Sequence, residues 1–405
     1  MLVDAAGTLI GALPEFPAPE PWWQQAADVV AGARERFGAE LTLLRLLAAD
    51  RQQPPAGALS YLAELDAPLP SSSARVLERV PAALLELVNA PDPARAPWAI
   101  VGGPAASLRW ARQALRELGR GELTRAEQQR TWNLSTTWRL SSVTDDGVAS
   151  TAWLKQVPRF FLHEAAVLRW LGQHAPGVAV PLLACDGQGR ALLEHAPGAD
   201  AYGSPGLDRE RFAVALDRLQ RVARGAVDEL LALGVPDLRD AALVDFMRRA
   251  LGASHADVSA VSGLIDGLPE RLAAVRACGV DDTLVHGDFH PGNVRSDGAG
   301  ISVIDWGDSF VGHPAFDIAR LADGCSADDA KFLIRSWCER LRERSPASEP
   351  ERAVELLRPV VPLRQAAVFA AWLPQIEATE HPYHALDVGT CLADAGRIWR
   401  ASEAR

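Results

Sequence analysis

Residues 283–308, TLVHGDFHPGNVRSDGAGISVIDWGD, form the only strand-like stretch in a C-terminal half whose pattern is otherwise helical. Leu284 and Val285 predict one short buried strand, and the run ISVI at 301–304 predicts a second. Between them, HGDFHPGNV places polar side chains around a Pro-Gly turn, where they could bind a metal, move a proton or only shape the turn. A chain with this insert must fold so that its helices hold a small β-hairpin with polar residues at the strand ends.

The middle of the chain predicts a β-rich lobe that precedes these helices. WNLSTTWRLSSV alternates apolar and polar residues, a turn follows at 145–147, and STAWLKQV alternates again, which is typical of a β-hairpin. An amphipathic helix and two further strands complete the lobe, and their expected ranges are 160–175, 178–186 and 190–198. The sequence therefore predicts an α+β chain with a β-rich lobe at 123–197 and a mainly helical lobe at 198–405.

The first 122 residues predict a small mixed α/β domain, separated from the rest by the polar stretch GRGELTRAEQQ. Its expected elements are a helix that Gly38 closes, strands at 40–48 and 58–65, a helix at 74–88 that Pro81 must kink or divide, a strand at 98–102 and a helix at 107–119. We consider three roles for this accessory domain: dimerisation, which would make the protein a homodimer, a lid, or substrate gating.

Charge and cysteine content exclude several classes of protein. A net charge of −11 over 405 residues disfavours nucleic-acid binding, because neutralising phosphates requires a basic surface. The five cysteines are scattered, odd in number and never in a CxxC pair, which argues against a disulfide framework or a zinc knuckle. No signal peptide and no apolar run of membrane-spanning length is apparent. These features predict a cytoplasmic protein that does not associate with membranes.

Asp288, Asn293 and Asp305 are the residues from which chemistry is expected. Asp288 and Asn293 flank the Pro-Gly turn, and Asp305 ends the second strand, so the three side chains can converge at one end of two neighbouring strands. Carboxylate and amide oxygens are hard ligands that suit Mg²⁺, which also takes waters and substrate phosphates. Asp288 could instead stay off the metal and accept a proton from an attacking hydroxyl.

HGDFHPGNV followed by VIDWGD resembles the catalytic loop and metal-binding segment of the aminoglycoside phosphotransferase and choline kinase family. The resemblance covers residues 125–395 and implies a two-lobed protein-kinase-like fold with ATP and Mg²⁺ as cofactors. It implies that Asp288 is the catalytic base, that Asn293 and Asp305 bind the metal, and that His286 supports the loop. The continuation GHPAFDIARL resembles the family's G-x-P-x-x-D-L-A segment, which gives Asp317 a mainly structural role.

The β-rich lobe agrees with this resemblance. Lys155, one of only two lysines in the chain, closes a strand where a kinase-like lysine contacts the ATP phosphates. Glu164, on the next helix, matches its partner glutamate, and the backbone near Glu194 and His195 matches the hinge that binds adenine. The chain departs from the kinase pattern in two respects. NLSTTWRLSS stands where a G-x-G-x-x-G phosphate loop would be, so the sequence does not determine the geometry of this loop. Lys155 and Glu164 are also close in sequence, which implies a short connection through Pro158.

The resemblance therefore predicts an ATP- and Mg-dependent kinase that phosphorylates a hydroxyl of a small, amino-bearing or sugar-like molecule. One alternative is a catalytically inactive protein that keeps the fold and binds a nucleotide or another ligand. A second is a metallohydrolase in which His286, Asp288 and His290 form an H-x-D-x-H site, with His313 as a near candidate for a further ligand. In the kinase interpretation His290 has no assigned role.

The stretch WLPQIEATEHPYHALD is the most site-like part of the helical lobe. It combines aromatic rings with hydrogen-bond acceptors, as a substrate pocket would, and the candidates are Trp372, Glu377, His381 and Tyr383. A helix end with a solvated polar turn explains the same residues. The acidic net charge favours an amino-bearing acceptor, and the sequence does not distinguish between aminoglycosides, amino sugars and choline-like amines.

Overall fold

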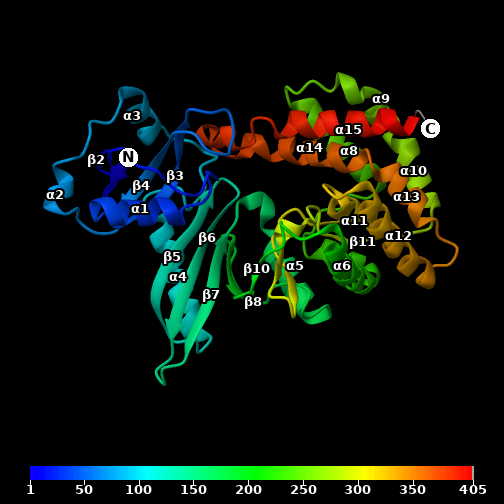
Figure 1. Cartoon of the computed structure of the whole chain (residues 1–405), viewed down its shortest axis with the longest axis horizontal. Coiled ribbons are helices and arrows are strands. Elements are labelled where there is room, and N and C mark those ends of the chain that lie inside the picture. Colours follow the sequence, from blue (N-terminus) through cyan, green and yellow to red (C-terminus); the bar gives the residue numbers. More distant parts are fainter. Residues whose placement is uncertain (404–405) are drawn as a thin grey trace. The chain divides into compact units, whose positions relative to one another are not determined.

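The computed structural model describes residues 1–403 and divides into two compact units (Figure 1). Unit 1 contains residues 1–160, 183–195 and 372–385, and unit 2 contains residues 161–182, 196–371 and 386–405. Unit 1 holds the larger sheets, whereas unit 2 is mainly helical. The predicted α+β class, with a β-rich part followed by a helical part, is confirmed.

The elements of unit 1 alternate between two sheets and the helices that cover them. In chain order they are β1 (Leu2–Val3), β2 (Leu9–Gly11), α1 (Ala27–Phe37), β3 (Leu41–Ala49), β4 (Leu59–Leu65), α2 (Ser71–Ala74), α3 (Ala82–Asn89), α4 (Gly103–Glu117), β5 (Glu122–Trp132), β6 (Ser135–Val143), β7 (Ala149–Gln156), β8 (Leu182–Cys185), β9 (Arg190–Glu194) and the 3-10 turns η6 (Leu373–Gln375) and η7 (Ala378–His384).

The first sheet of unit 1 has the strand order β2-β1-β4-β3. Strand β3 is buried along most of its length because its sequence, LTLLRLLAA, is apolar at nearly every position. It pairs antiparallel with β4, and α1 packs on it through Ala33. The one charged residue within the strand, Arg45, is only 2% exposed and therefore requires buried partners.

The second sheet has the order β5-β6-β7-β9-β8 and carries the predicted hairpin. Strands β6 and β7 pair in register from Thr136–Gln156 to Val143–Ala149 around the turn at Gly147, as the alternation predicts. Helix α4 covers one face, where Ala111 and Leu115 pack against Trp138 and Leu154. The sheet thus has an apolar core on the α4 side, and it holds Lys155 in a central strand.

Unit 2 is a set of helices around a short ribbon of strands. Its elements are α5 (His163–His174), β10 (Ala199–Asp200), α6 (Arg209–Ala223), α7 (Val227–Ala232), α8 (Asp240–Ala253), α9 (Ser262–Asp266), α10 (Leu268–Ala277), β11 (Thr283–Val285), the 3-10 turn η5 (Pro291–Asn293), β12 (Val294–Ser296), β13 (Ile301–Val303), β14 (Phe310–Gly312), α11 (Ala315–Ala322), α12 (Ala327–Arg344), α13 (Pro350–Leu357), α14 (Val360–Trp372) and α15 (Asp387–Glu403). β11 pairs antiparallel with β14, and β12 with β13.

Several predicted elements differ from the structure. The stretch 119–129, expected to be a domain boundary, is mostly strand β5, and residues 98–102 form tight turns instead of a strand. The helix expected at 74–88 is divided at Pro81, as its sequence allows, and α3 begins only after that proline. The amphipathic pattern of residues 207–234 predicts one long helix, whereas the structure divides this stretch into α6 and α7 near Gly225.

The compact units do not follow the predicted boundary at residue 122, because residues 1–160 belong to one unit. Whether residues 1–122 fold as a domain of their own stays a prediction. Of the helices that the structure describes, none has the length and apolar character needed to cross a bilayer.

Candidate active site

The loop that follows β11 is fixed by its backbone. Thr283–Val285 is fully buried and paired with β14, so the chain leaves the ribbon at His286 with a defined direction. Gly287 has φ 85°, and a Cβ there would overlap the carbonyl oxygen of Asp308. Only glycine fits this position. The close approach of the two backbones brings the loop against the segment that follows Asp305.

Asp317 fixes the start of the loop through hydrogen bonds to its backbone. Its two carboxylate oxygens accept hydrogen bonds from the backbone N–H groups of His286, at 2.9 Å, and Gly287, at 3.0 Å. Asp317 is completely buried, and burial raises its pKa to about 7. This geometry gives Asp317 the structural role that its motif predicts.

His286 supports the loop from inside the core. Its ring is buried, with Nδ1 accepting a hydrogen bond from the Asp288 N–H at 3.3 Å and Nε2 lying 3.0 Å from the Ile304 carbonyl oxygen. A carbonyl can only accept, so Nε2 carries the proton and Nδ1 does not. Burial lowers the pKa of His286 to about 4. The neutral ring therefore joins the loop to the strand that delivers Asp305.

Asp288 and Asn293 lie together across the turn η5. The Asn293 amide nitrogen donates to the Asp288 carbonyl oxygen at 3.0 Å and lies 3.4 Å from Asp288 Oδ2. The backbone carbonyl oxygen of Asn293 accepts a hydrogen bond from the Ile304 N–H at 2.9 Å. Asp305 is the next residue after this contact. The structure therefore brings Asp288 and Asn293 into contact, as the sequence predicts, and a backbone hydrogen bond joins Asn293 to the residue before Asp305.

Two further side chains hold the Asp288 carboxylate. Arg320, on α11, donates from Nε to Oδ1 at 2.9 Å, and His290 Nε2 lies 3.3 Å from Oδ2. Burial alone would favour the protonated acid, but the hydrogen bond from His290 and the positive charge of Arg320 outweigh it and hold the pKa of Asp288 well below its usual range. Asp288 is therefore a carboxylate at neutral pH.

His290, which has no role in the sequence interpretation, has two in the structure. Its Nε2 contacts Asp288, and its Nδ1 accepts from the Gly292 N–H at 3.0 Å, which starts the turn η5. The ring of Tyr202 lies against it at a centroid distance of 5.4 Å. His290 thus couples the shape of the turn to the position of Asp288.

The Glu164 side chain contacts the backbone directly after Asp305. Asp305 has φ 65°, a conformation that a non-glycine residue adopts rarely and that is often found at functional sites. The next N–H, that of Trp306, donates to Glu164 Oε1 at 3.1 Å. Glu164 is 4% exposed at the start of α5. Sequence reasoning gives Glu164 only a lysine as partner, and the structure adds this contact to the residue that follows Asp305.

Lys155 lies on β7, where Thr137 of β6 and Ala191 of β9 are its neighbours in register. It belongs to unit 1 and Glu164 to unit 2, so their pairing stays a prediction. Glu194, at the end of β9, forms an ion pair with Arg120 through both carboxylate oxygens, and His195 Nδ1 accepts from Trp153 Nε1 at 3.1 Å. The backbone role predicted for Glu194 and His195 is compatible with these side-chain contacts.

The oxygens available near the loop fit a magnesium ion. Because the Asn293 amide nitrogen is used by Asp288, the amide oxygen is the atom that Asn293 would offer to a cation. Together with the Asp305 carboxylate it makes a small set of hard ligands, which suits an ion that takes its remaining ligands from phosphates and water. Within residues 1–403 no group of three or more His, Cys, Asp or Glu side chains is arranged to hold a metal by itself.

The histidines of the H-x-D-x-H string do not present a transition-metal site. His286 has both ring nitrogens in hydrogen bonds with the backbone, and His290 uses its nitrogens for the Gly292 N–H and Asp288. Metal ligation requires a free nitrogen lone pair on each histidine. The geometry therefore disfavours the metallohydrolase alternative.

The four candidate substrate residues lie in unit 1, mostly inside its core. Glu377 is 5% exposed and paired with Arg45 and Arg95, and Tyr383 packs between Trp23 and Leu46. Trp372 is 4% exposed and packs against His384, and His381 Nε2 lies 3.3 Å from the Ile376 carbonyl oxygen. The alternative of a solvated polar turn is wrong for Trp372, Glu377 and Tyr383, because these side chains are buried. Contact of the four residues with a substrate stays a prediction.

Sequence reasoning did not identify Arg320 and Arg364. Arg364 is buried and donates to the carbonyl oxygens of Gly287 and Asp308, each at 2.9 Å, so that it joins the two backbones of the site. Nothing in its helical context distinguishes it. Arg320 could have been found, since it stands three residues after Asp317, one turn along the same helix.

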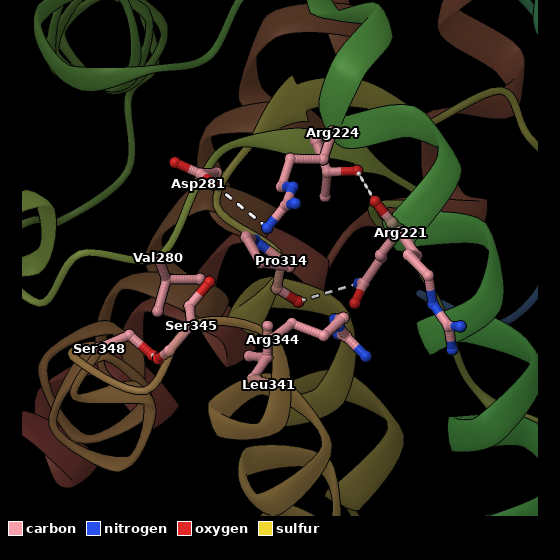
Figure 2. A pocket seen from close by; sticks show the side chains of 11 residues that line it. Arg221, Arg224, Val280, Asp281, Pro314, Leu341, Arg344, Ser345 and Ser348 are labelled. Carbon is pink, nitrogen blue, oxygen red and sulfur yellow. Dashed lines mark hydrogen bonds and ion pairs between the residues drawn. The ribbon is translucent and has the colours of Figure 1, made fainter.

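A separate pocket in unit 2 lies at the other end of β11 (Figure 2). Thr283, the first residue of that strand, lines the pocket, and none of the predicted site residues does. Arg224 points across it toward Asp281, with 3.4 Å between Nη1 and Oδ2. Arg344 is paired with the buried Asp217. Arg221, which also lines the pocket, shares Asp217 with Arg344, so three arginines stand against two carboxylates.

A model of the phosphotransferase enzyme family (APH) matches residues 135–347, a range that includes Lys155, Asp288, Asn293 and Asp305. No curated protein matches the sequence.

Solved structures with a similar arrangement include an ethanolamine kinase from Plasmodium vivax, with 14% identity over 66% of this chain and 81% of that chain and a TM-score of 0.49. A choline/ethanolamine kinase family protein from Mesorhizobium loti has 14% identity over 73% and 99%, with a TM-score of 0.48. A macrolide 2'-phosphotransferase from Brachybacterium faecium has 14% identity over 69% and 98%, with a TM-score of 0.47.

Proposed function

Because the chain belongs to the phosphotransferase enzyme family, we propose that it transfers the γ-phosphate of ATP, with Mg²⁺, to a hydroxyl of a small amino-bearing or sugar-like molecule. The observation that carries this proposal is the contact between Asn293 and Asp288 across the turn η5, next to the strand that ends at Asp305. A catalytic base and two hard metal ligands at one place are what phosphoryl transfer to an alcohol requires.

In this proposal Asp288 orients the acceptor hydroxyl and accepts its proton as the bond to phosphorus forms. Its carboxylate is already ionised and fixed by Arg320 and His290, so that little reorganisation is needed when the alcohol binds. Asn293 and Asp305 would hold Mg²⁺, which neutralises charge on the transferring phosphate when bound. His286 and Asp317 act indirectly, by fixing the backbone of the loop.

Unit 1 would bind the nucleotide. Lys155 would contact the ATP phosphates, and the register of β6 and β7 supports a neighbouring role for the β5–β6 turn. Lys155 is opposite Thr137, and the turn at Asn133 lies four residues before Thr137, so both stand at the same end of the sheet. Backbone groups near Glu194 and His195 would bind adenine.

Coupled measurement of ADP release tests the proposal, with ATP, Mg²⁺ and a panel of amino sugars, aminoglycosides and choline-like amines as acceptors. We expect at least one acceptor to stimulate ADP release in a magnesium-dependent way. Asp288→Ala should abolish this stimulation while ATP binding, followed by calorimetry, remains close to that of the unmodified protein.

Asp297→Ala is the matched control, because Asp297 lies in the exposed turn between β12 and β13 and binds only local backbone N–H groups. Its turnover should equal that of the unmodified protein. Turnover that survives in Asp288→Ala would contradict the assignment of the base. ATP binding without turnover on any acceptor and without a magnesium requirement would favour the inactive ligand-binding alternative.

A further inference from the structure

Asn133, in the turn between β5 and β6, is buried, and this turn stands where the family resemblance places the phosphate loop. Strand β5 ends at Trp132 and β6 begins at Ser135, so the turn consists of Asn133 and Leu134. Asn133 is only 4% exposed. Burying a polar side chain this deeply at a hairpin tip destabilises the fold unless hydrogen bonds satisfy its polar atoms.

The hydrogen bonds come from the segment between α14 and α15. His384 Nε2 lies 3.0 Å from Asn133 Oδ1, and since an amide oxygen can only accept, the histidine donates. The Asn133 amide nitrogen lies 3.5 Å from the Glu380 carbonyl oxygen. Glu380 continues the chain of contacts, because its Oε1 accepts from the Leu46 N–H at 3.2 Å. Residues 378–384 thus tie the hairpin tip to the buried strand β3.

Aromatic packing fixes the residue before the turn. The Trp132 ring contacts the rings of Tyr383 and His384 at centroid distances of 5.7 Å and 5.4 Å. Its carbonyl oxygen accepts from Trp98 Nε1 at 3.0 Å, and its own Nε1 donates to Ser135 Oγ at 3.2 Å. Side chains from three distant parts of the sequence therefore meet at this turn.

The outer edge of β5 is also covered. The Gln128 amide group pairs with the backbone N–H and carbonyl of Leu43, at 2.9 Å and 2.8 Å, as a neighbouring strand would. The Ala26 N–H donates to the Gln129 carbonyl, and the Thr131 N–H to the Gln24 carbonyl. The N-terminal residues thus occupy an edge that would otherwise be open, which restricts the motion of the hairpin.

We propose that Asn133 and His384 are positioning residues that hold the β5–β6 turn in a fixed conformation for the phosphates of the nucleotide. This inference rests on the proposed function, and it gives residues 1–122 and 372–385 a role as a brace for the nucleotide site. In many sites a flexible loop becomes ordered when its ligand binds, which lowers the affinity by the free energy of ordering. Here the buried contacts exist before the nucleotide arrives.

Binding of MgATP and of adenosine to the full chain, measured by calorimetry, tests the inference. Asn133→Ala and His384→Ala should raise the Kd for MgATP about tenfold, because each leaves one buried partner unsatisfied and loosens the turn. The Kd for adenosine, which has no phosphates, should stay within about twofold of the unmodified value. His384→Gln, whose amide can still donate to Asn133, should recover most of the MgATP affinity.

Matched controls are Asn89→Ala, an exposed asparagine at the end of α3, and His255→Ala, in the loop that follows α8. Both should bind MgATP as the unmodified protein does. Equal losses for MgATP and adenosine in the Asn133 and His384 variants would indicate a general structural effect and overturn the inference, as would unchanged MgATP binding. If the unmodified protein binds no MgATP, the proposed function itself fails.

Hydrogen exchange of the unmodified protein provides a test that does not depend on whether the variants fold. Amides of residues 131–136 should be protected without nucleotide, and MgATP should add little further protection. Fast exchange that becomes slow only when MgATP is present would mean that the turn is ordered by its ligand, which would overturn the inference.

Discussion

Arg320 Nε lies 2.9 Å from Asp288 Oδ1, so the base assigned to the reaction is bound to a cation before any acceptor arrives. We expect Arg320→Ala to lower kcat at least tenfold while the Kd for MgATP stays unchanged, because Asp288 loses the contact that sets its direction. Arg320→Lys should be intermediate, since lysine keeps the charge but not the planar geometry.

Arg276→Ala is the control for this prediction. Arg276 is in the same unit and also pairs with an aspartate, Asp240, on the helical surface. It should leave the kcat unchanged. Steady-state kinetics with the best acceptor decide the matter, and a normal kcat in Arg320→Ala would contradict a positioning role.

Gly287→Ala should destabilise the protein by more than about 3 kcal/mol and abolish turnover. The backbone at Gly287 is left-handed, and a Cβ there would overlap the Asp308 carbonyl oxygen. The loop at Gly287 and the segment at Asp308 would therefore have to move apart. Gly298→Ala is a close match, because Gly298 has φ 88° but open space around it. It should lose only about 1 kcal/mol, the cost of the backbone conformation alone. Chemical denaturation measures both.

Asp317→Asn should lower the free energy of unfolding by about 1–3 kcal/mol. Each carboxylate oxygen of Asp317 accepts one backbone N–H, and an amide would turn its own N–H group toward one of these donors. Asp297→Asn should be nearly neutral, because one oxygen, Oδ1, accepts both local N–H groups there. A thermal melt comparing the two variants tests this difference, and equal melting temperatures would contradict it.

Glu380 predicts a pH dependence of stability. Burial raises its pKa to about 8, whereas the carboxyl of an unfolded chain titrates near pH 4.3. The folded state therefore binds the proton more tightly, and the free energy of unfolding should fall as the pH rises from about 4.3 to about 8. Glu380→Gln cannot ionise and still accepts from the Leu46 N–H, so its Tm advantage should grow across this range.

Glu377→Gln is the contrasting variant for that measurement. It removes a carboxylate that is paired with Arg45 and Arg95, so it should lower the Tm throughout the same range. A Tm difference between Glu380→Gln and the unmodified protein that does not vary with pH would show that Glu380 is not protonated in the folded state.

The local chemistry could be predicted from sequence because it is encoded in short strings. HGDFHPGNV and VIDWGD each place their polar residues within a few positions of a buried strand, and that spacing is enough to bring Asp288 to Asn293. Strand β5 is not apparent in the sequence because its two well-buried residues, Gln128 and Thr131, are polar and give no apolar alternation. Its pairing with Leu43, 85 residues away, decides the conformation.

The surroundings of Glu377 and Tyr383 could not be predicted for a related reason. Their aromatic and acidic side chains fit a substrate pocket as well as they fit a core, and only the tertiary fold distinguishes the two. The partners Arg45 and Trp23 lie more than 300 residues earlier in the chain. No local pattern records contacts at that separation.

The passage of residues 372–385 through unit 1 has a consequence for synthesis of the chain. The sheet that contains β3 is translated before this segment, so Arg45 at first lacks Glu377, and the cluster of Trp23 and Leu46 lacks Tyr383. These partners follow more than 300 residues later in the chain. A charge and an apolar surface of this sheet therefore stay uncovered during translation until residues 377–383 have been made.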